Sequence, residues 1–260
     1  MEKTKIDWCD SSWNPVTGCY HDCEYCYARS IANRFSGNKT ADNIRVELND
    51  RIYSEKTKKN EAYPYGFVPT LHRYRLDEYE KKGGRNIFVC SMADLFGTWV
   101  PDSWIEEVFA ACEKAPQHNY LFLTKNPYRY VLLQEKNKLP SADNMWYGAS
   151  ATDEGEIRFA AKMLKRLNHD TKSFLSIEPM LEDITSSDAW EFCISEHIVD
   201  WVIVGAETGN RKNKIIPERD WIESIFHDCQ REDIPVFMKS SLTNVWERPL
   251  LQDFPKELWR

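Results

Sequence analysis

Six short apolar runs recur along the chain from residue 87 onward, separated by segments with the periodicity of a helix. The runs are rich in β-branched and aromatic residues and are almost continuously apolar, which is typical of parallel strands buried on both faces. They predict the strands Ile87–Cys90, Tyr120–Leu123, Met145–Gly148, Ser173–Ile177, Trp201–Val204 and Val236–Met238. Strands and helices that alternate in this way predict an α/β fold with a parallel sheet or barrel.

An earlier candidate strand, Trp13–Thr17, would raise the number of strands from six to seven. The helical periodicity predicts helices at Tyr27–Phe35, Trp104–Glu113, Pro127 to about Glu135, Glu154–Leu167, Ser187–His197 and Glu218–Arg231. Asp102 or Ser103 is the expected N-cap of the helix that contains Trp104. We therefore expect residues 1–260 to form a single domain, built as a full or partial parallel (β/α) barrel.

A polar segment at about residues 35–85 interrupts this pattern. Over residues 34–85 the net charge is +4. The rest of the chain has a net charge of −11, which gives −7 overall. Loops of this length inside a compact domain are usually functional or mobile. Two interpretations stay open. The segment is an irregular surface excursion, or it is a basic lid over an anionic substrate with the aromatic residues Tyr63, Tyr65, Phe67, His72 and Tyr74.

Composition excludes several classes of protein. A membrane-spanning helix needs roughly 18 consecutive apolar residues, and the longest apolar runs here are as short as Trp201–Val204. The segment Met1–Asp7 is charged and lacks the apolar core of a secretion signal, so a cytoplasmic location without a membrane partner is expected. The net charge of −7 argues against a protein that coats nucleic acid nonspecifically.

Charged or hydroxyl residues follow every predicted strand. Ligands of parallel barrels and open α/β sheets bind at the carboxyl ends of the strands. The candidates there are Ser91, Asp94, Lys125, Ser176, Glu178, Gly205, Glu207 and Lys239. Each of these residues could instead be an ordinary polar loop residue, because the loops that follow strands are usually polar. Glu178 would also suit an ion pair with one of the lysines. Carboxylates and lysines at several strand ends nevertheless predict one polar ligand-binding site at the mouth of the barrel.

Three of the eight cysteines lie close together, at Cys19, Cys23 and Cys26. In a cytosolic protein, clustered cysteines indicate metal or redox chemistry, and three thiolates on a short loop can bind three irons of a 4Fe–4S cubane. No fourth cysteine follows at matching spacing, which would leave one iron open to a small molecule. A structural zinc site would need four ligands, with His21 or Cys9 as the fourth.

The pattern Cys19-x3-Cys23-x-Tyr25-Cys26 resembles the signature of the radical S-adenosylmethionine (radical SAM) superfamily. The resemblance implies that the three cysteines hold a 4Fe–4S cluster. Its open iron would chelate the amino and carboxylate groups of S-adenosylmethionine (SAM), with Tyr25 near the adenine. The resemblance also implies a full or partial (β/α) barrel, which agrees with the number of predicted strands.

One departure from that superfamily concerns the second predicted strand. Many radical SAM enzymes have Gly-Gly-Glu there to hold the methionyl amine of SAM, whereas this chain has Ser91-Met92-Ala93-Asp94. The expected cofactor-binding residues are accordingly Tyr25, Ser91, Asp94, Ser176, Gly205 and Glu207. The expected catalytic residues, which would face the substrate, are Lys125, Glu178 and Lys239.

A second resemblance covers nearly the whole chain. It is carried, in order, by Trp13-Asn14-Pro15, Ser91–Phe96, Leu123-Thr124-Lys125, Ser176-Ile177-Glu178-Pro179, Val204–Gly209 and Phe237-Met238-Lys239. Together these motifs are similar to a phage-associated family of three-cysteine-motif proteins, which is also common in bacterial genomes. That family implies a cofactor class but no particular substrate.

We therefore expect an enzyme that cleaves SAM reductively to a 5′-deoxyadenosyl radical, which abstracts hydrogen from a substrate. It would need an external one-electron donor of the flavodoxin or ferredoxin type. The basic segment and the strand-end lysines favour a nucleotide or nucleic acid as substrate, although the net charge of −7 weakens this interpretation. The alternative is a zinc- or Fe–S-binding interaction or sensor module of a phage or defence system, without turnover.

Overall fold

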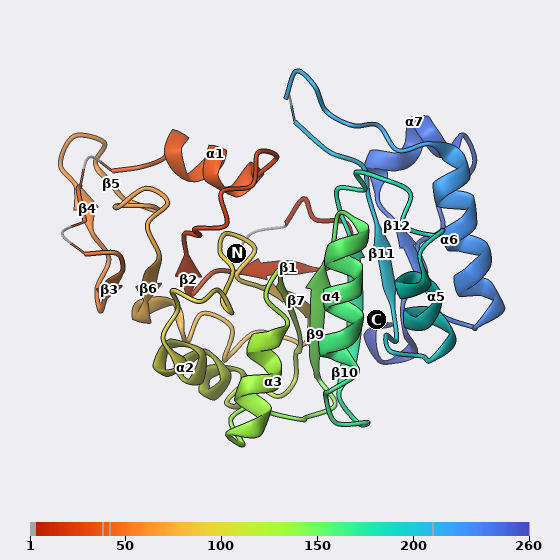
Figure 1. Ribbon diagram of the computed structural model, residues 1–260. Coiled ribbons are helices and arrows are strands. Elements are labelled where there is room, and N and C mark those ends of the chain that lie inside the picture. The colour runs from red at the N-terminus through yellow and green to blue at the C-terminus, as the bar shows by residue number, and fades with distance from the viewer. Residues whose placement is uncertain (1–3, 38, 42, 210, 260) are drawn as a thin grey trace.

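The computed structural model describes residues 4–37, 39–41, 43–209 and 211–259. Its main sheet has seven strands: β1 (Ser11–Trp13), β7 (Asn86–Val89), β8 (Asn119–Thr124), β9 (Met145–Ser150), β10 (Lys172–Ile177), β11 (Val202–Val204) and β12 (Val236–Met238). They lie in the order β1-β7-β8-β9-β10-β11-β12, and every neighbouring pair is parallel. The sheet curls into a partial parallel (β/α) barrel (Figure 1). The predicted α/β barrel class is confirmed.

Helices connect successive strands of this sheet. They are α2 (Asp102–Glu113), α3 (Tyr128–Glu135), α4 (Glu154–Leu164), α5 (Asp188–Ser195) and α6 (Arg219–Arg231), with α1 (Tyr27–Arg34) earlier and α7 (Thr243–Trp246) later. Short 3-10 turns occupy Arg73–Arg75, Ser240–Leu242 and Lys256–Leu258. The predicted N-cap of α2 is wrong. Pro101 caps that helix, while Asp102 forms ion pairs with Arg129 (2.6 Å) and Lys136 (2.8 Å).

The two faces of the sheet bury different side chains. In β10, Leu175 and Ile177 pack outward against the helices, whereas Phe174 points to the inside of the barrel. The inner cluster is largely aromatic and is made of Trp8, Phe88, Leu121, Trp146, Phe174, Trp201, Ile203, Phe237 and Leu258. Close-packed rings therefore fill the lower part of the barrel. The carboxyl ends of the strands are left as the place where a ligand can enter.

The predicted strand Trp13–Thr17 is two strands. After β1 the chain breaks at Asn14-Pro15, and β2 (Val16–Thr17) pairs antiparallel with β6 (Thr70–His72) of the polar insertion. Pro15 has no amide hydrogen for a sheet hydrogen bond. The Asn14 side-chain oxygen accepts hydrogen bonds from the Met92 amide (2.9 Å) and the Ser91 hydroxyl (3.2 Å). Through the side chain of Asn14, the segment between β1 and β2 thus holds the start of the cysteine loop against the end of β7.

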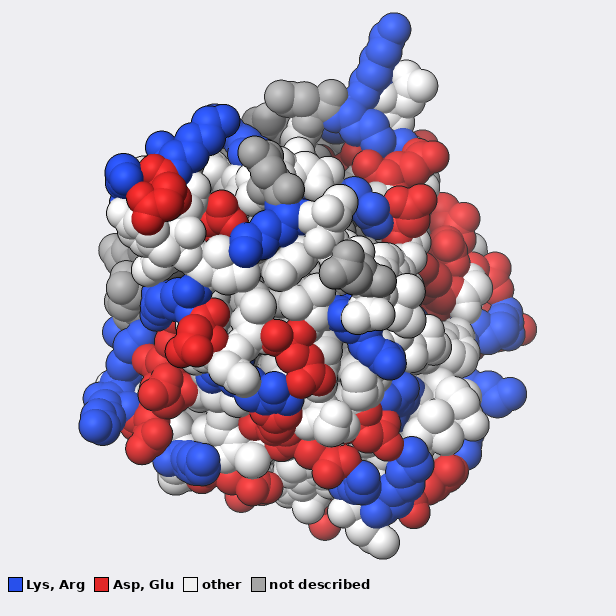
Figure 2. Space-filling model, turned by 90° about the vertical axis from the view of Figure 1, so that its left-hand side faces the viewer, with Lys and Arg blue, Asp and Glu red and all other residues white. Residues whose placement is uncertain are grey.

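The polar insertion is ordered around small sheets. It contains β3 (Val46–Leu48), β4 (Tyr53–Ser54), β5 (Lys59–Asn60) and β6, and it lies beside α1, away from the main sheet (Figure 1). Arg73 pairs with both Glu47 and Glu107 at 2.8 Å. On the face that carries the insertion, cationic and anionic side chains are interspersed (Figure 2). Much of its positive charge is therefore balanced locally.

Within the ranges that the structure describes, no helix has the length and the apolar character required to cross a bilayer.

Gly18 is the residue at which the insertion meets the cysteine loop. Its φ is +88°, and an added Cβ would lie 2.4 Å from the Val68 carbonyl oxygen. We expect Gly18→Ala to lower the free energy of unfolding by about 2 kcal/mol or more, because the side chain would add both a clash and backbone strain. Urea unfolding measures this. Gly83→Ala is the control, since an added Cβ there meets no heavy atom within 4 Å, and it should change stability by less than about 0.5 kcal/mol. Equal losses in the two variants would contradict the prediction.

Candidate functional site

One cavity joins the cysteine loop to the carboxyl ends of the main strands. Its empty volume is about 1050 Å³, counting the part open to solvent. Eleven predicted site residues line it: Cys19, Cys23, Tyr25, Cys26, Ser91, Asp94, Lys125, Ser176, Glu178, Glu207 and Lys239. Residues more than 200 positions apart in the sequence therefore share one chamber. This convergence follows from parallel pairing, which puts the carboxyl ends of all strands at one edge.

Backbone hydrogen bonds hold the cysteine loop on two sides. The Gly18 amide donates to the Met92 carbonyl (2.9 Å) and the Cys19 amide to the Phe67 carbonyl (3.3 Å). Cys26 is the N-cap of α1, and its Sγ accepts a hydrogen bond from the Arg29 amide (3.3 Å). Such N–H···S bonds tune thiolates that ligate iron. Of the aromatic residues proposed as a lid, Phe67 lines the cavity, while His72 lies buried against Thr17 (2.9 Å).

Burial keeps the thiols of Cys19 and Cys23 protonated at neutral pH. Burial raises the pKa of Cys19 to about 12. Burial also raises the pKa of Cys23, and the nearby Lys125 opposes that increase. Metal ligation by these residues must therefore release protons. Among the described residues, no three His, Cys, Asp or Glu side chains converge closely enough to hold a single ion. A closed zinc site needs such convergence, whereas the ligands of a cubane each bind a different iron.

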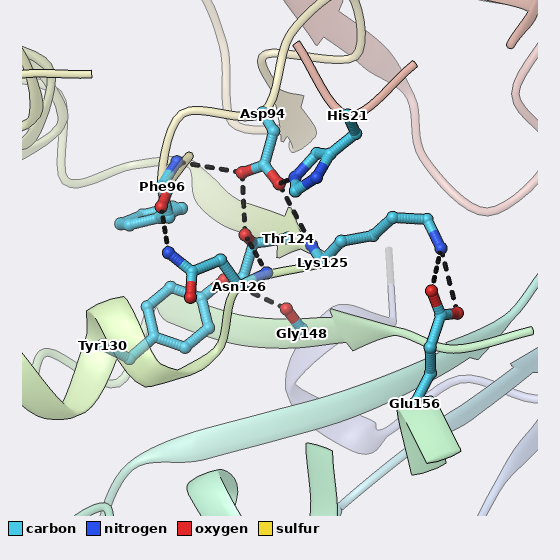
Figure 3. Close-up of polar contacts among 9 residues, drawn as sticks. All are labelled: His21, Asp94, Phe96, Thr124, Lys125, Asn126, Tyr130, Gly148 and Glu156. Atoms are coloured by element: carbon cyan, nitrogen blue, oxygen red, sulfur yellow. Dashed lines mark hydrogen bonds and ion pairs between the residues drawn. The ribbon is translucent and has the colours of Figure 1, made fainter. Parts of the chain in front are cut away.

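Asp94 is the centre of a buried hydrogen-bond network at the ends of β7 and β8. One carboxylate oxygen accepts from His21 Nε2 (2.7 Å) and the Lys125 amide (3.1 Å). The other accepts from the Thr124 hydroxyl (2.7 Å) and the Phe96 amide (3.0 Å). The four donors surround the carboxylate in Figure 3. His21, considered as a fourth metal ligand, is thus directed to Asp94, and the network fastens the cysteine loop to the sheet.

Ser91 keeps acceptor capacity toward the cavity. Its hydroxyl donates to Asn14 (3.2 Å), and its carbonyl accepts from the Tyr27 phenol (2.7 Å). A hydroxyl oxygen has two lone pairs. An ammonium group in the cavity can therefore donate to Ser91 without disturbing either contact.

Lys125 extends from the end of β8 to the start of α4 (Figure 3). Its Nζ lies 2.7 and 2.9 Å from the two carboxylate oxygens of Glu156, and 5.7 Å from the centre of the Tyr25 ring. Burial alone would lower the pKa of Lys125, but the bonds to Glu156 and Tyr25 raise it above its ordinary value. For Glu156 the effects have the opposite sign. Burial alone would raise the pKa of Glu156, but the contact with Lys125 lowers that pKa below 4.5. Both groups are charged near neutral pH.

Glu178 and Lys239 form an ion pair between the ends of β10 and β12. This is the alternative that the sequence left open for Glu178. Gly205 does not belong to the residues that line the cavity. A Cβ at Gly205 would lie 3.0 Å from Lys239 Cδ and 3.2 Å from Glu178 Cγ. Its amide donates to Ile177 and its carbonyl accepts from Met180, both at 3.0 Å. Gly205 therefore gives space to the ion pair rather than backbone bonds to a ligand.

Glu207 is nearly inaccessible to solvent and is held by a bidentate contact with Arg211, at 2.7 and 2.6 Å. Arg211 lowers the pKa of Glu207 below its ordinary value. The same guanidinium reaches Glu24 in the cysteine loop (3.1 Å). Arg211 thus connects the segment after β11 with the cysteine loop across the mouth of the cavity.

Sequence reasoning missed Trp8 and Glu156 at the site. Trp8 lines the cavity, as does Ser150, which follows the predicted strand Met145–Gly148. Glu156 carries the pattern Asp153-x-x-Glu156, which predicts a helix capping box. Asp153 does cap α4, but Glu156 turns to Lys125 and to Thr152 instead. No local pattern indicates this long-range partner.

The fold is a partial parallel (β/α) barrel, and three clustered cysteines line the cavity at its mouth. It is similar to solved structures of spore photoproduct lyase. The enzyme complexed with dinucleoside spore photoproduct gives a TM-score of 0.53 at 10% identity, and a cysteine-to-alanine mutant with the same ligand gives 0.52 at 9%. Each comparison covers 91% of this chain and 78% of the other. This likeness concerns the fold.

The model of the family described as "Protein of unknown function (DUF5131)" matches residues 3–247, and the chain belongs to that family. No curated protein matches the chain in sequence.

The Lys125–Glu156 pair predicts a pH-dependent contribution to stability. Because the pKa of folded Glu156 lies below its ordinary 4.5, its stabilising effect is present above that pH and is lost as the pH falls through the folded pKa. We expect Glu156→Gln to lower the free energy of unfolding by about 1 kcal/mol at pH 7. The difference from the wild type should shrink below pH 4.5 in urea unfolding curves.

Glu154→Gln is the matched control on the same helix, because Glu154 pairs with Arg158 at an exposed position. Its effect should stay within about 0.5 kcal/mol. A pH-independent loss in Glu156→Gln would show that the ion pair is not its cause.

Proposed function

We propose that this protein is a radical SAM enzyme that acts on a nucleotide or nucleic acid. The observation that carries the proposal is the shared cavity: three cysteine thiols line the same chamber as the polar ends of β7, β8, β10, β11 and β12. A binding or sensor module would need the cysteine loop but has no reason to gather acids and lysines at five strand ends. Catalysis on a bound substrate does need such groups.

The residues at the mouth fit the implied cofactors. Cys19, Cys23 and Cys26 would hold a 4Fe–4S cluster, because their sulfur atoms are the ligands it requires and no fourth cysteine lines the cavity among the described residues. Ser176, expected from the sequence to bind the cofactor, has a buried hydroxyl in the cavity wall without a partner among the described residues, and we assign it to the substrate rather than to SAM. When bound, the cluster supplies the electron that cleaves SAM to methionine and a 5′-deoxyadenosyl radical, which takes hydrogen from the substrate.

The chain's own residues orient the ligands. Ser91 accepts from the methionyl amine of SAM, and Tyr25 packs near the adenine. Glu207, fixed by Arg211, accepts from ribose hydroxyls. Asp94 has four donors already, so we assign it to positioning. It holds the cysteine loop through His21 and would bind the amine only by exchanging one of those donors. The apolar walls keep water from the reacting groups.

The substrate would lie toward Glu178, Lys239 and Lys125. Each lysine has a carboxylate partner, so an anionic substrate group would bind by sharing or displacing that partner. A nucleotide or nucleic acid substrate is supported by the likeness in fold to an enzyme whose structure contains a dinucleoside. Turnover would require an external one-electron donor of the flavodoxin or ferredoxin type.

Electron paramagnetic resonance of the anaerobically reconstituted and reduced protein tests the proposal. We expect a 4Fe–4S signal that shifts when SAM is added, because SAM binds the open iron. Cys23→Ala should abolish the signal. Cys229→Ala, which removes a buried cysteine of α6 outside the cavity, should keep it. Tight binding of one zinc, or a cluster signal that SAM leaves unchanged, would overturn the enzyme proposal in favour of the non-catalytic module.

A further inference from the structure

Two polar atoms in the cavity wall are buried without a partner. They are Nε1 of Trp8 and Oγ of Ser176, and neither has a hydrogen-bond partner among the described residues. Trp8 and Ser176 are each 1% exposed, and both line the cavity. Buried polar groups in proteins are nearly always hydrogen-bonded. Other buried atoms, such as Nε1 of Trp146, also lack a described partner, but only these two share the cavity among the described residues, where a ligand can complete them.

The surroundings of this pair are flat and apolar. Trp8 packs against Phe88 with ring centres 4.6 Å apart and against Phe174 at 6.1 Å. Leu123 and Pro179 also line the cavity. Ser176 lies beside Ser150 in the register of β10 and β9, and both serines line the cavity. An indole N–H donates only, whereas a hydroxyl both donates and accepts. An apolar slot with a few hydrogen-bonding groups fits the edge of a planar heterocycle.

Trp8 comes from the segment that covers the open side of the barrel. Asp7 accepts a hydrogen bond from the Ser240 amide (2.7 Å), next to the end of β12. Asp10 accepts one from the Asn86 amide (2.7 Å) at the start of β7. The segment thus spans the gap between the edge strands β1 and β12, and Trp8 lies on its inner side.

We propose that Trp8 and Ser176 recognise the base of a nucleoside in the substrate. The proposal rests on the enzyme function proposed above and specifies its substrate. The unpartnered N–H and hydroxyl bind acceptor and donor atoms on the edge of the base, while Leu123 and Pro179 contact the base plane. The two unsatisfied groups destabilise the free protein, and this loss of folding free energy is recovered when the base binds.

Stability of the free protein gives the first test. Ser176→Ala removes a hydroxyl that lacks a partner, so we expect it to raise the thermal midpoint by about 2 °C or more. Ser173→Ala is the control on the same strand. The buried Ser173 hydroxyl donates to the Ile198 carbonyl (2.7 Å), and its loss should lower the midpoint. A lower midpoint in Ser176→Ala would mean that the hydroxyl is already satisfied, and would overturn the proposal.

Binding to the reconstituted protein gives the second test. The probes are thymidine, deoxycytidine, deoxyguanosine and deoxyadenosine, each with SAM present, together with SAM alone, all followed by calorimetry. Trp8→Phe and Ser176→Ala should each weaken binding of the preferred nucleoside about tenfold. Their affinity for SAM should change less than about twofold. Trp146→Phe is the matched control, because its buried N–H also lacks a described partner but the residue does not line the cavity. It should leave both affinities unchanged.

The outcomes separate the two proposals. Failure of all four nucleosides to bind, while SAM still shifts the cluster signal, would overturn base recognition and leave the enzyme function standing. A loss of SAM affinity in Trp8→Phe with unchanged nucleoside affinity would assign the site to the cofactor's adenine, and would also overturn the proposal. Failure of SAM to shift the cluster signal would overturn the enzyme function and, with it, the assignment of a substrate base to Trp8 and Ser176.

Discussion

Parallel pairing of seven strands is the constraint on which the site depends. Because no pair in the main sheet is antiparallel among the described residues, the carboxyl ends of all its strands lie at one edge. Side chains from β7 to β12 thus reach a common chamber, although more than 100 residues separate Ser91 from Lys239. The aromatic cluster inside the barrel fills the space below them. Ligand chemistry is therefore confined to the upper layer, where the strands end.

Ion pairs and hydrogen bonds then fix the polar groups at that edge. Asp94 links the cysteine loop to β8 through three of its four contacts, and Lys125, Glu178 and Glu207 each have a charged partner. Charged groups that are paired before a ligand arrives require less reorganisation when it binds. Trp8 Nε1 and Ser176 Oγ differ from them, because no described residue satisfies them. The wall of the cavity thus combines a pre-paired outer part with an unpaired inner part.

Much of the fold could be predicted from the sequence, since nearly continuous apolar runs such as Val202–Val204 indicate buried parallel strands by themselves. The split of Trp13–Thr17 was missed although Asn14-Pro15 is a local break signal, because the pairing of β2 with β6 of the insertion is a long-range contact that no local pattern indicates. The predicted site residues converge because their positions follow from strand ends. Their partners, such as Glu156 for Lys125 and Arg211 for Glu207, could not be predicted. They come from loops and helix starts whose positions depend on tertiary packing.

The cysteine loop also joins two distant parts of the chain. Its backbone is bonded to Met92 on one side and to Phe67 of the insertion on the other, and α1 continues directly from Cys26. The positions of the three thiols therefore depend on how the insertion packs against the sheet, although most of the insertion lies far from Cys19 in the sequence. A substitution within the insertion can then alter the mouth of the cavity without changing any residue that lines it.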